Sequence, residues 1–154
     1  MENRRPAGAL DIGASAFMSS TMRDEQLPLT ILIVEDEWAV REVIAMYFED
    51  MGWRVVAVPS GEQAVDTLAR DAIDVVFTDI RLGGRVSGWD VAAAARRADR
   101  MMPVIYASGR SSSSSARRVA GSVFFDKPYR PADIMRACRR MLDTERSAAA
   151  TRPA

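Results

Sequence analysis

The sequence contains no histidine and only one cysteine among its 154 residues. The absence of histidine excludes Ser-His-Asp triads and most catalytic zinc sites, and it removes any role as a histidine phosphodonor. The single cysteine, Cys138, excludes an internal disulfide. Because the N-terminus also shows no secretory signal pattern, we expect a cytoplasmic protein in a reducing environment. Its chemistry must depend on carboxylates, hydroxyl groups or amines.

Lysine is as scarce as cysteine, since Lys127 is the only lysine among 21 basic residues and all the others are arginine. Wherever the chain needs only positive charge, it uses a guanidinium group. The single lysine therefore indicates a position that requires a compact ammonium group instead.

The chain also lacks an excess of charge of either sign, because its 21 basic residues balance 21 acidic ones. This balance provides no broad basic surface for a phosphate backbone, so nucleic acid is not an expected partner. No apolar run approaches the length that spans a bilayer, so we expect a soluble protein without membrane contacts. A chain of this length fits one domain with its own buried core.

Short apolar runs alternate with helical periodicities from residue 29 onward, which predicts a doubly wound α/β fold with a five-stranded parallel sheet. The expected strands span residues 29–34, 53–58, 73–78, 103–107 and 122–125. Helices are expected after each strand, with a capping sequence at Ser60 and with Pro131 in the first turn of the last one. The first helix should end near Gly52, and its predicted apolar face consists of Val40, Val43, Ile44, Tyr47 and Phe48.

The ends of the chain differ from this pattern. Residues 1–27 show no sustained hydrophobic period and are expected to form a flexible extension. Residues 28–145 form the expected domain, and residues 146–154 are expected to be a disordered tail.

Polar residues follow four of the five expected strands at their carboxyl ends, where the active sites of doubly wound sheets lie. Glu35 and Asp36 follow the first strand, and Asp79 follows the third. Ser108 and Lys127 follow the fourth and fifth. Three carboxylates at one sheet edge repel one another unless a cation lies among them, and oxygen ligands without histidine or cysteine favour Mg²⁺. An acidic triplet after a strand is more often a solvated loop or a helix cap, but its conjunction with Asp79 disfavours that alternative.

Mg²⁺ prefers a site that remains open to waters and phosphate oxygens. A transferring phosphoryl group needs a nucleophile, a metal ion on its oxygens, an ammonium group and a hydroxyl donor. Asp79, Mg²⁺, Lys127 and Ser108 supply these four parts. For Ser108 the alternative remains a simple turn residue, since it precedes a glycine.

Four short motifs in chain order resemble those of the receiver domain of bacterial two-component response regulators, and the resemblance covers roughly residues 29–143. They are Val34-Glu35-Asp36-Glu37, Thr78-Asp79, Tyr106-Ala107-Ser108-Gly109 and Asp126-Lys127-Pro128. The resemblance implies a flavodoxin-like (βα)5 fold with strand order 2-1-3-4-5. It also implies a phosphorylation switch that is not an enzyme beyond catalysing its own phosphorylation and dephosphorylation.

The resemblance further assigns roles to individual residues. Asp79 would accept the phosphoryl group, and Glu35, Asp36, Asp79 and the backbone carbonyl of Arg81 would hold Mg²⁺. Ser108 would move toward the phosphorylated site, and Phe124 would be the coupled aromatic side chain that turns inward. The phosphodonor would be a sensor histidine kinase or a histidine phosphotransfer protein.

No second domain follows Asp143 in this sequence, so we expect a stand-alone receiver, as a monomer or weak dimer, that signals to an unknown protein target by contact. The expected output surface is the face formed by the helix after the fourth strand, the fifth strand and the last helix. The segment 103–109 is also similar to the motif of a stand-alone receiver subgroup of alphaproteobacteria named for its Phe-Ala-Thr-Gly core. That similarity suggests a role in stress signalling.

Two regions depart from the usual receiver pattern. The loop from Arg81 to Arg85 has no proline and is one residue longer than usual. The segment between Gly109 and Gly121 contains five consecutive serines, which are poor helix formers, so the fourth helix is expected to be short or frayed. We hypothesise that phosphorylation orders or repositions residues 111–119.

Three other functions are known for chains with a doubly wound fold or a receiver-like site. A flavodoxin requires a phosphate-binding loop after the first strand, where Glu35, Asp36 and Glu37 would repel the phosphate of FMN. An aspartyl-phosphate phosphatase requires an acid two residues after its nucleophile, and Arg81 occupies that position. A phosphate-independent interaction module, or a phosphate sink, remains the alternative.

Overall fold

The computed structural model describes residues 27–109 and 115–151. Five parallel strands form one sheet in the order β2-β1-β3-β4-β5, which confirms the predicted fold class and strand order. The strands are β1 (Thr30–Val34), β2 (Arg54–Val58), β3 (Val75–Asp79), β4 (Val104–Ser108) and β5 (Val123–Asp126). Residues 1–26, most of the predicted N-terminal extension, lie outside the described residues.

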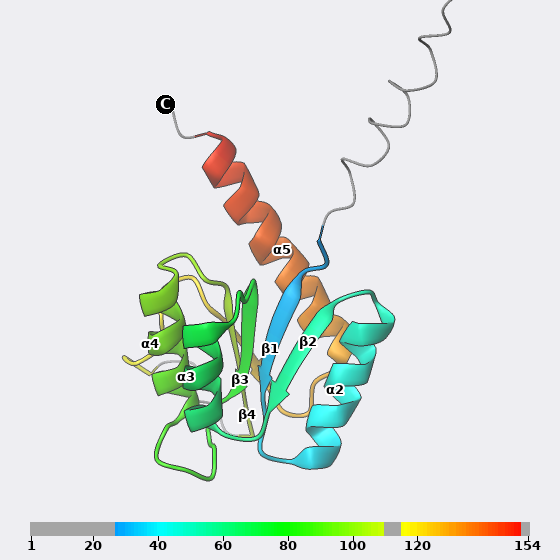
Figure 1. Ribbon diagram of the computed structural model, residues 1–154, viewed down its shortest axis with the longest axis vertical. Coiled ribbons are helices and arrows are strands. Elements are labelled where there is room, and N and C mark those ends of the chain that lie inside the picture. Colours follow the sequence, from blue (N-terminus) through cyan, green and yellow to red (C-terminus); the bar gives the residue numbers. More distant parts are fainter. Residues whose placement is uncertain (1–26, 110–114, 152–154) are drawn as a thin grey trace, which may run out of the picture.

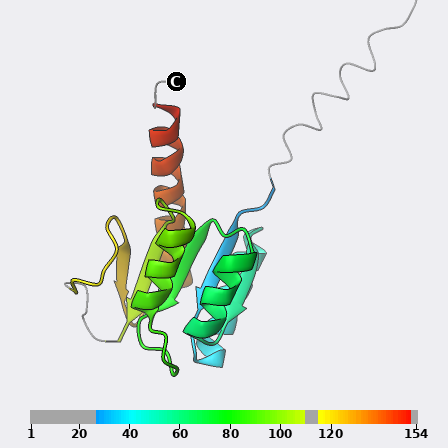
Figure 2. The ribbon, with the colours of Figure 1, turned by 60° about the vertical axis from the view of Figure 1, so that its left-hand side comes forward.

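Two layers of helices cover the sheet (Figures 1 and 2). Helices α2 (Trp38–Asp50) and α5 (Pro131–Ala150) pack on one face, and α3 (Gly61–Arg70) and α4 (Gly88–Ala98) pack on the other. This arrangement is the one that right-handed crossovers between parallel strands produce. No helix within 27–109 or 115–151 is long and apolar enough to cross a bilayer.

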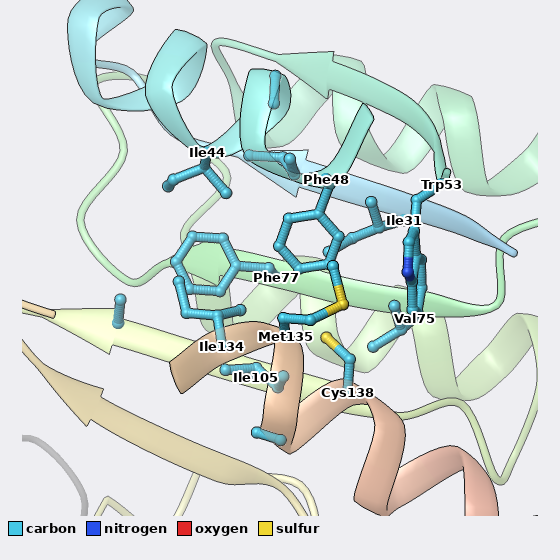
Figure 3. Packing of buried hydrophobic residues seen from close by; sticks show 14 of the residues in the cluster. Ile31, Ile44, Phe48, Trp53, Val75, Phe77, Ile105, Ile134, Met135 and Cys138 are labelled. Carbon is cyan, nitrogen blue, oxygen red and sulfur yellow. The ribbon is translucent and has the colours of Figure 1, made fainter. Parts of the chain in front are cut away.

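The three central strands, β1, β3 and β4, are buried along their whole length. Helices on both faces exclude water from every side chain of these strands, which explains why their sequences are almost continuously apolar. Figure 3 shows the core beneath α2 and α5, where Phe48 lies edge-on to Trp53 with ring centroids 5.4 Å apart. Cys138 is fully buried in this core, and burial raises the pKa of its thiol to about 12.

The apolar face of α2 differs from the predicted one at a single position. Ile44 and Phe48 are buried as expected, but the side chain of Val43 is 59% exposed. Ala45 occupies the buried face instead. Successive helical residues are about 100° apart, so a face centred on Ile44, Ala45 and Phe48 turns Val43 toward water. Gly52 ends the helix with a φ of 84°, as its position predicts.

The segment between β4 and β5 also differs from the expectation of a helix after every strand. Its described part, residues 115–122, forms turns and contains no helix. Serine side chains compete for backbone hydrogen bonds, and Gly121 adopts a φ of 71°, which a helix cannot accommodate. Residues 110–114, which include most of the serine run, lie outside the described residues.

The C-terminal helix is longer than predicted. Helix α5 continues to Ala150, whereas the sequence pattern predicted a disordered tail from residue 146. Its last residues are exposed and include Ala148, Ala149 and Ala150, and alanine has the highest intrinsic helix propensity. Helix formation therefore continues beyond the end of the apolar periodicity.

The positions of Phe48 and Val43 predict opposite responses to truncation. Phe48→Ala should lower the free energy of unfolding by about 3–5 kcal/mol because it leaves a cavity between α2 and the sheet. The matched control Val43→Ala removes an exposed side chain and should change the free energy of unfolding by less than about 0.5 kcal/mol. Urea denaturation of both variants tests the assignment, and equal losses would contradict it.

Candidate functional site

The carboxyl ends of four strands bring the predicted site residues together at one edge of the sheet. Asp79 is the last residue of β3, and Ser108 is the last residue of β4. Glu35 and Lys127 come directly after β1 and β5. The backbone N–H of Lys127 donates to the carbonyl of Ser108 over 2.8 Å. The hydrogen bonding between β4 and β5 therefore extends into the site itself.

Three carboxylates meet at this edge. One oxygen from each of Glu35, Asp36 and Asp79 lies within 4.8 Å of the other two. Glu35 is fully buried and Asp79 is 6% exposed, while Asp36 is open to solvent. The grouping of these three residues matches the predicted metal ligands. All the donors are oxygen atoms and one side is open, which suits Mg²⁺ with its preference for waters and phosphate oxygens in the remaining positions.

Burial is the main influence on Glu35, and it raises the pKa of its carboxyl group above the ordinary value of 4.5. The backbone N–H of Glu37 donates to Glu35 Oε1 over 3.1 Å and opposes this shift, as does the charge of Lys127. The negative charge of Asp79 adds to it. A divalent cation would relieve this cost because it favours the ionised carboxylate.

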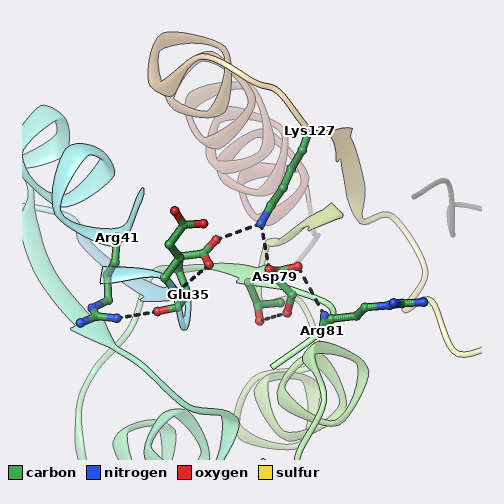
Figure 4. A network of polar contacts seen from close by, with 7 residues as sticks. Glu35, Arg41, Asp79, Arg81 and Lys127 are labelled. Carbon is green, nitrogen blue, oxygen red and sulfur yellow. Dashed lines mark hydrogen bonds and ion pairs between the residues drawn. The ribbon is translucent and has the colours of Figure 1, made fainter. Parts of the chain in front are cut away.

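Lys127 is placed between the two buried carboxylates (Figure 4). Its Nζ atom lies 2.9 Å from Asp79 Oδ2 and 3.3 Å from Glu35 Oε2. Partial burial disfavours the charged ammonium group, but the hydrogen bond and charge of Asp79, followed by those of Glu35, outweigh it and raise the pKa of Lys127 above its ordinary value. Lys127 is therefore charged at neutral pH. Its contacts with two carboxylates are consistent with the prediction that this position requires a compact ammonium group.

Arg41 supports Glu35 from helix α2, a role that the sequence pattern did not reveal. Its Nη1 atom donates to the backbone carbonyl of Glu35 over 2.8 Å (Figure 4). This bond fixes the chain where β1 ends and the acidic cluster begins. A basic residue near a helix N-terminus is unfavourable for the helix dipole, and this is the one signal from which a specific contact could have been inferred.

A pocket of about 310 Å³ opens beside the acidic cluster. Asp79, Ser108 and Lys127 line it together with Arg81 and Gly109. The structure therefore brings the predicted nucleophile, hydroxyl group and ammonium group to one cavity. The backbone N–H of Arg81 donates to Asp79 Oδ1 over 3.4 Å, and the use of its carbonyl as a metal ligand stays a prediction.

The backbone behind Asp79 depends on a glycine. The N–H of Gly88 donates to the carbonyl of Ile80 over 2.9 Å, and a Cβ atom at Gly88 would overlap the carbonyl oxygen of Asp79. Helix α4 begins there, with Ser87 and Asp90 forming a reciprocal capping box. The absence of a side chain at Gly88 thus permits α4 to start directly against β3.

Phe124, the predicted switch residue, lies next to a second aromatic residue, Tyr106. The two residues are register partners on β5 and β4, and their ring centroids are 6.4 Å apart. Phe124 is half-buried, whereas Tyr106 is fully buried and packs on Trp89 of α4 at 4.7 Å. Tyr106 Oη accepts a hydrogen bond from the backbone N–H of Val119 over 3.2 Å. Tyr106 therefore connects β4 with the segment between β4 and β5.

Residues 31–139 match a family model described as the response regulator receiver domain. Among solved structures, a response regulator receiver protein from Sinorhizobium medicae WSM419 is 35% identical, with a TM-score of 0.72 over 75% of this chain and 95% of that chain. The receiver domain of the sensor histidine kinase PA1611 from Pseudomonas aeruginosa PAO1, with a magnesium ion coordinated in its active-site cleft, is 25% identical. Its TM-score is 0.64 over 76% of this chain and 99% of that chain.

The response regulator SaeR of Staphylococcus aureus (strain USA300) is 28% identical over 108 residues. The match covers 68% of this chain and 46% of SaeR. The chain thus spans about half the length of the curated relatives that it matches.

The buried acidic cluster predicts that Mg²⁺ stabilises the folded state. At a hundredfold excess over its Kd, Mg²⁺ should raise the free energy of unfolding by about 2.7 kcal/mol, because it binds only the folded site. Protonation of Glu35 competes with the metal. Since the pKa of Glu35 lies above 4.5, the gain should decline at a higher pH than for an ordinary carboxyl group. Thermal unfolding with and without Mg²⁺ from pH 7 downward measures both effects.

Glu35→Gln provides the matched variant for this measurement. It retains the side-chain shape but cannot ionise, so most of the Mg²⁺-dependent gain should disappear at every pH. A gain in Glu35→Gln equal to that of the original chain would show that the metal binds elsewhere.

Proposed function

This chain belongs to the response regulator receiver domain family of two-component systems, and we propose on that basis that Asp79 accepts a phosphoryl group beside Mg²⁺ held by Glu35, Asp36 and Asp79. The observation that supports this assignment best is the position of Lys127. Its ammonium group contacts Asp79 at 2.9 Å and Glu35 at 3.3 Å, next to the open pocket. This position supports Asp79 as the acceptor residue.

The chemistry follows from the two oxygens of Asp79. Oδ2 accepts a hydrogen bond from Lys127 over 2.9 Å. Oδ1 accepts a longer and weaker one, over 3.4 Å, from the backbone N–H of Arg81. One carboxylate oxygen attacks phosphorus as the bond to the leaving group breaks, and the leaving group departs with the electron pair. Mg²⁺ would neutralise charge on the phosphoryl oxygens. Lys127 holds a second phosphoryl oxygen, and the Ser108 hydroxyl donates to a third.

The phosphorylated histidine of a donor must lie outside these 154 residues, because they contain no histidine. Receiver domains take phosphoryl groups from histidine kinases or histidine phosphotransfer proteins, and we propose one of these as the partner. The chain is then a signalling module whose only catalysis is its own phosphorylation and dephosphorylation. Its stand-alone action, its cytoplasmic location, a monomeric or weakly dimeric state and the stress-signalling subgroup stay predictions from the sequence.

Arg81 has two proposed roles at the rim of the pocket. Its backbone carbonyl would complete the protein ligands of Mg²⁺, as the resemblance to receiver domains implies. Arg81 also lines the pocket together with Asp79 and Lys127. A guanidinium group there attracts an anionic phosphodonor and influences how long the acyl phosphate persists.

The proposed output surface comprises residues 115–122, β5 and α5. Ser108 is the candidate hydroxyl that moves toward the phosphoryl group, and Phe124 is the candidate aromatic side chain that turns inward. The ring of Tyr106 adjoins Phe124 and its hydroxyl group reaches Val119. We infer that movement of Phe124 displaces Tyr106 and so alters residues 115–122. Residues 111–114 of the segment 111–119 lie outside the described residues, and its reordering on phosphorylation stays a prediction.

The alternative function is a phosphate-independent interaction module or a phosphate sink. A module that no longer used phosphate would have no reason to retain two buried carboxylates around one lysine, because burying charge is costly. The intact arrangement of Glu35, Asp79 and Lys127 therefore favours phosphoryl acceptance.

Asp79→Asn tests the acceptor directly. After incubation with acetyl phosphate and Mg²⁺, intact-mass spectrometry should show the gain of one phosphoryl group on the original chain and none on the variant, because the amide is a poor nucleophile. The matched control Asp74→Asn alters another aspartate near β3 and should leave the gain unchanged. Equal modification of Asp79→Asn, or no modification of the original chain, would refute the acceptor.

Tyr106→Phe tests the connection to the output surface. The variant removes only the hydroxyl group, so phosphoryl acceptance should be unchanged. Loss of one hydrogen bond is worth about 1 kcal/mol, so hydrogen exchange at the Val119 amide should be about fivefold faster. Phosphorylation is expected to change the hydrogen exchange of residues 115–122 in the original chain, and this change should be smaller in Tyr106→Phe. Tyr47→Phe on α2 is the matched control, and an exchange profile of Tyr106→Phe identical to that of the control would disprove the connection.

A further inference from the structure

The loop between β3 and α4 borders the acidic cluster on two sides. At its start, Arg81 donates to Asp79 and lines the pocket. Further along, a Cβ atom on Gly83 would lie 3.9 Å from Asp36 Oδ2. The proposed metal site therefore has one wall formed by a loop, residues 81–86, whereas its other residues lie at strand ends. Whatever fixes this loop also fixes that wall.

The carboxylate of Glu62 ties this loop to helix α3. Its Oε1 atom accepts hydrogen bonds from the backbone N–H groups of Arg85 and Val86, over 2.8 and 3.3 Å. Glu62 lies in the first turn of α3, and the two donors are 23 and 24 residues later in the chain. These bonds are long-range and join the loop to the helix.

The packing around these bonds is too close for larger residues. A Cβ atom on Gly84 would lie 2.5 Å from Glu62 Oε1, and one on Gly61 would overlap the backbone of Val86. Two glycines on opposite sides of the contact thus allow the loop to lie directly against the N-terminus of α3. Hydrogen bonding and close packing independently place the loop at the same position.

Charge favours the same arrangement. The hydrogen bonds from the Arg85 and Val86 amides stabilise the ionised carboxylate, and the pKa of Glu62 lies below its ordinary value, first because of a bond with its own backbone and then because of these bonds. An anionic group in the first turn is also favoured by the helix dipole. Glu62 therefore remains an acceptor throughout the physiological pH range.

We propose that Glu62 is a positioning residue for the metal and phosphoacceptor site, which acts by holding the 81–86 loop against α3. Residues 81–86 contain no proline, so no ring restricts the backbone torsions of this loop, and the restraint must come from contacts. Two backbone N–H donors on one carboxylate oxygen supply that restraint. Glu62 touches neither the ion nor the phosphoryl group. It limits the conformations of the residues that do, and so reduces the entropy lost when they bind.

The test is a Mg²⁺ titration of the full chain. Tryptophan fluorescence reports binding and gives the Mg²⁺ concentration at half-saturation. Glu62→Ala should raise it about threefold to tenfold, because the loop must be ordered on binding. Gly84→Ala, which forces the carboxylate away from the loop, should produce a similar rise. At saturating Mg²⁺ both variants should still gain one phosphoryl group from acetyl phosphate, since Asp79 and Lys127 are unchanged.

Two controls separate this role from general effects. Glu62→Gln retains an oxygen acceptor without the charge and should remain within about twofold of the original chain. Asp66→Ala removes an exposed carboxylate from the same helix and should have no effect. If Glu62→Gln is impaired as strongly as Glu62→Ala, charge rather than loop position is responsible and the inference is wrong.

This inference rests on the proposed function, and the two fail differently. If the original chain neither binds Mg²⁺ nor accepts a phosphoryl group, the proposed function fails. If the original chain does both and Glu62→Ala has an unchanged half-saturation point, the function stands and the positioning role of Glu62 is refuted.

Discussion

The structure depends on holding two carboxylates, those of Glu35 and Asp79, in a buried position where only one ammonium group balances them. Removing two anions from water is expensive, and like charges at short range add to that cost. Lys127 offsets part of it through contacts with both groups. Burial is the largest cause of the raised pKa of Glu35, and the charge of Asp79 adds to it. Two ionised carboxylates beside one ammonium group also leave a net negative charge, and this is the physical reason why the site suits a divalent cation and, with that cation, an anionic phosphoryl group.

The rest of the fold makes this cost tolerable. Three central strands are buried along their entire length, so the strand ends are fixed by a large apolar core on both faces of the sheet. The supports beyond the core are backbone contacts made by side chains of neighbouring helices. Arg41 of α2 holds the carbonyl of Glu35, and Glu62 of α3 holds the N–H groups after Gly84. Both supports act on the loops that follow strands rather than on the strands.

Much of this arrangement follows from patterns that lie close together in the sequence. Buried parallel strands have continuous apolar runs, and the residues after them meet at one edge, so Glu35, Asp79, Ser108 and Lys127 were predicted correctly as neighbours. Val43 was assigned to the buried face wrongly, because an apolar residue at the border of a helical face can point either way. The helix expected after β4 is absent from residues 115–122, and α5 extends into residues assigned to a tail. Arg41 and Glu62 were missed because their partners are backbone groups, which every sequence contains.

The hydrogen bond from the Lys127 N–H to the Ser108 carbonyl makes the amine and the hydroxyl group of the site parts of one rigid unit. A displacement of the end of β4 toward the acceptor necessarily shifts the backbone that bears the ammonium group. Movement of one strand end is thereby transmitted to the other through the backbone, which couples the positions of the two functional groups.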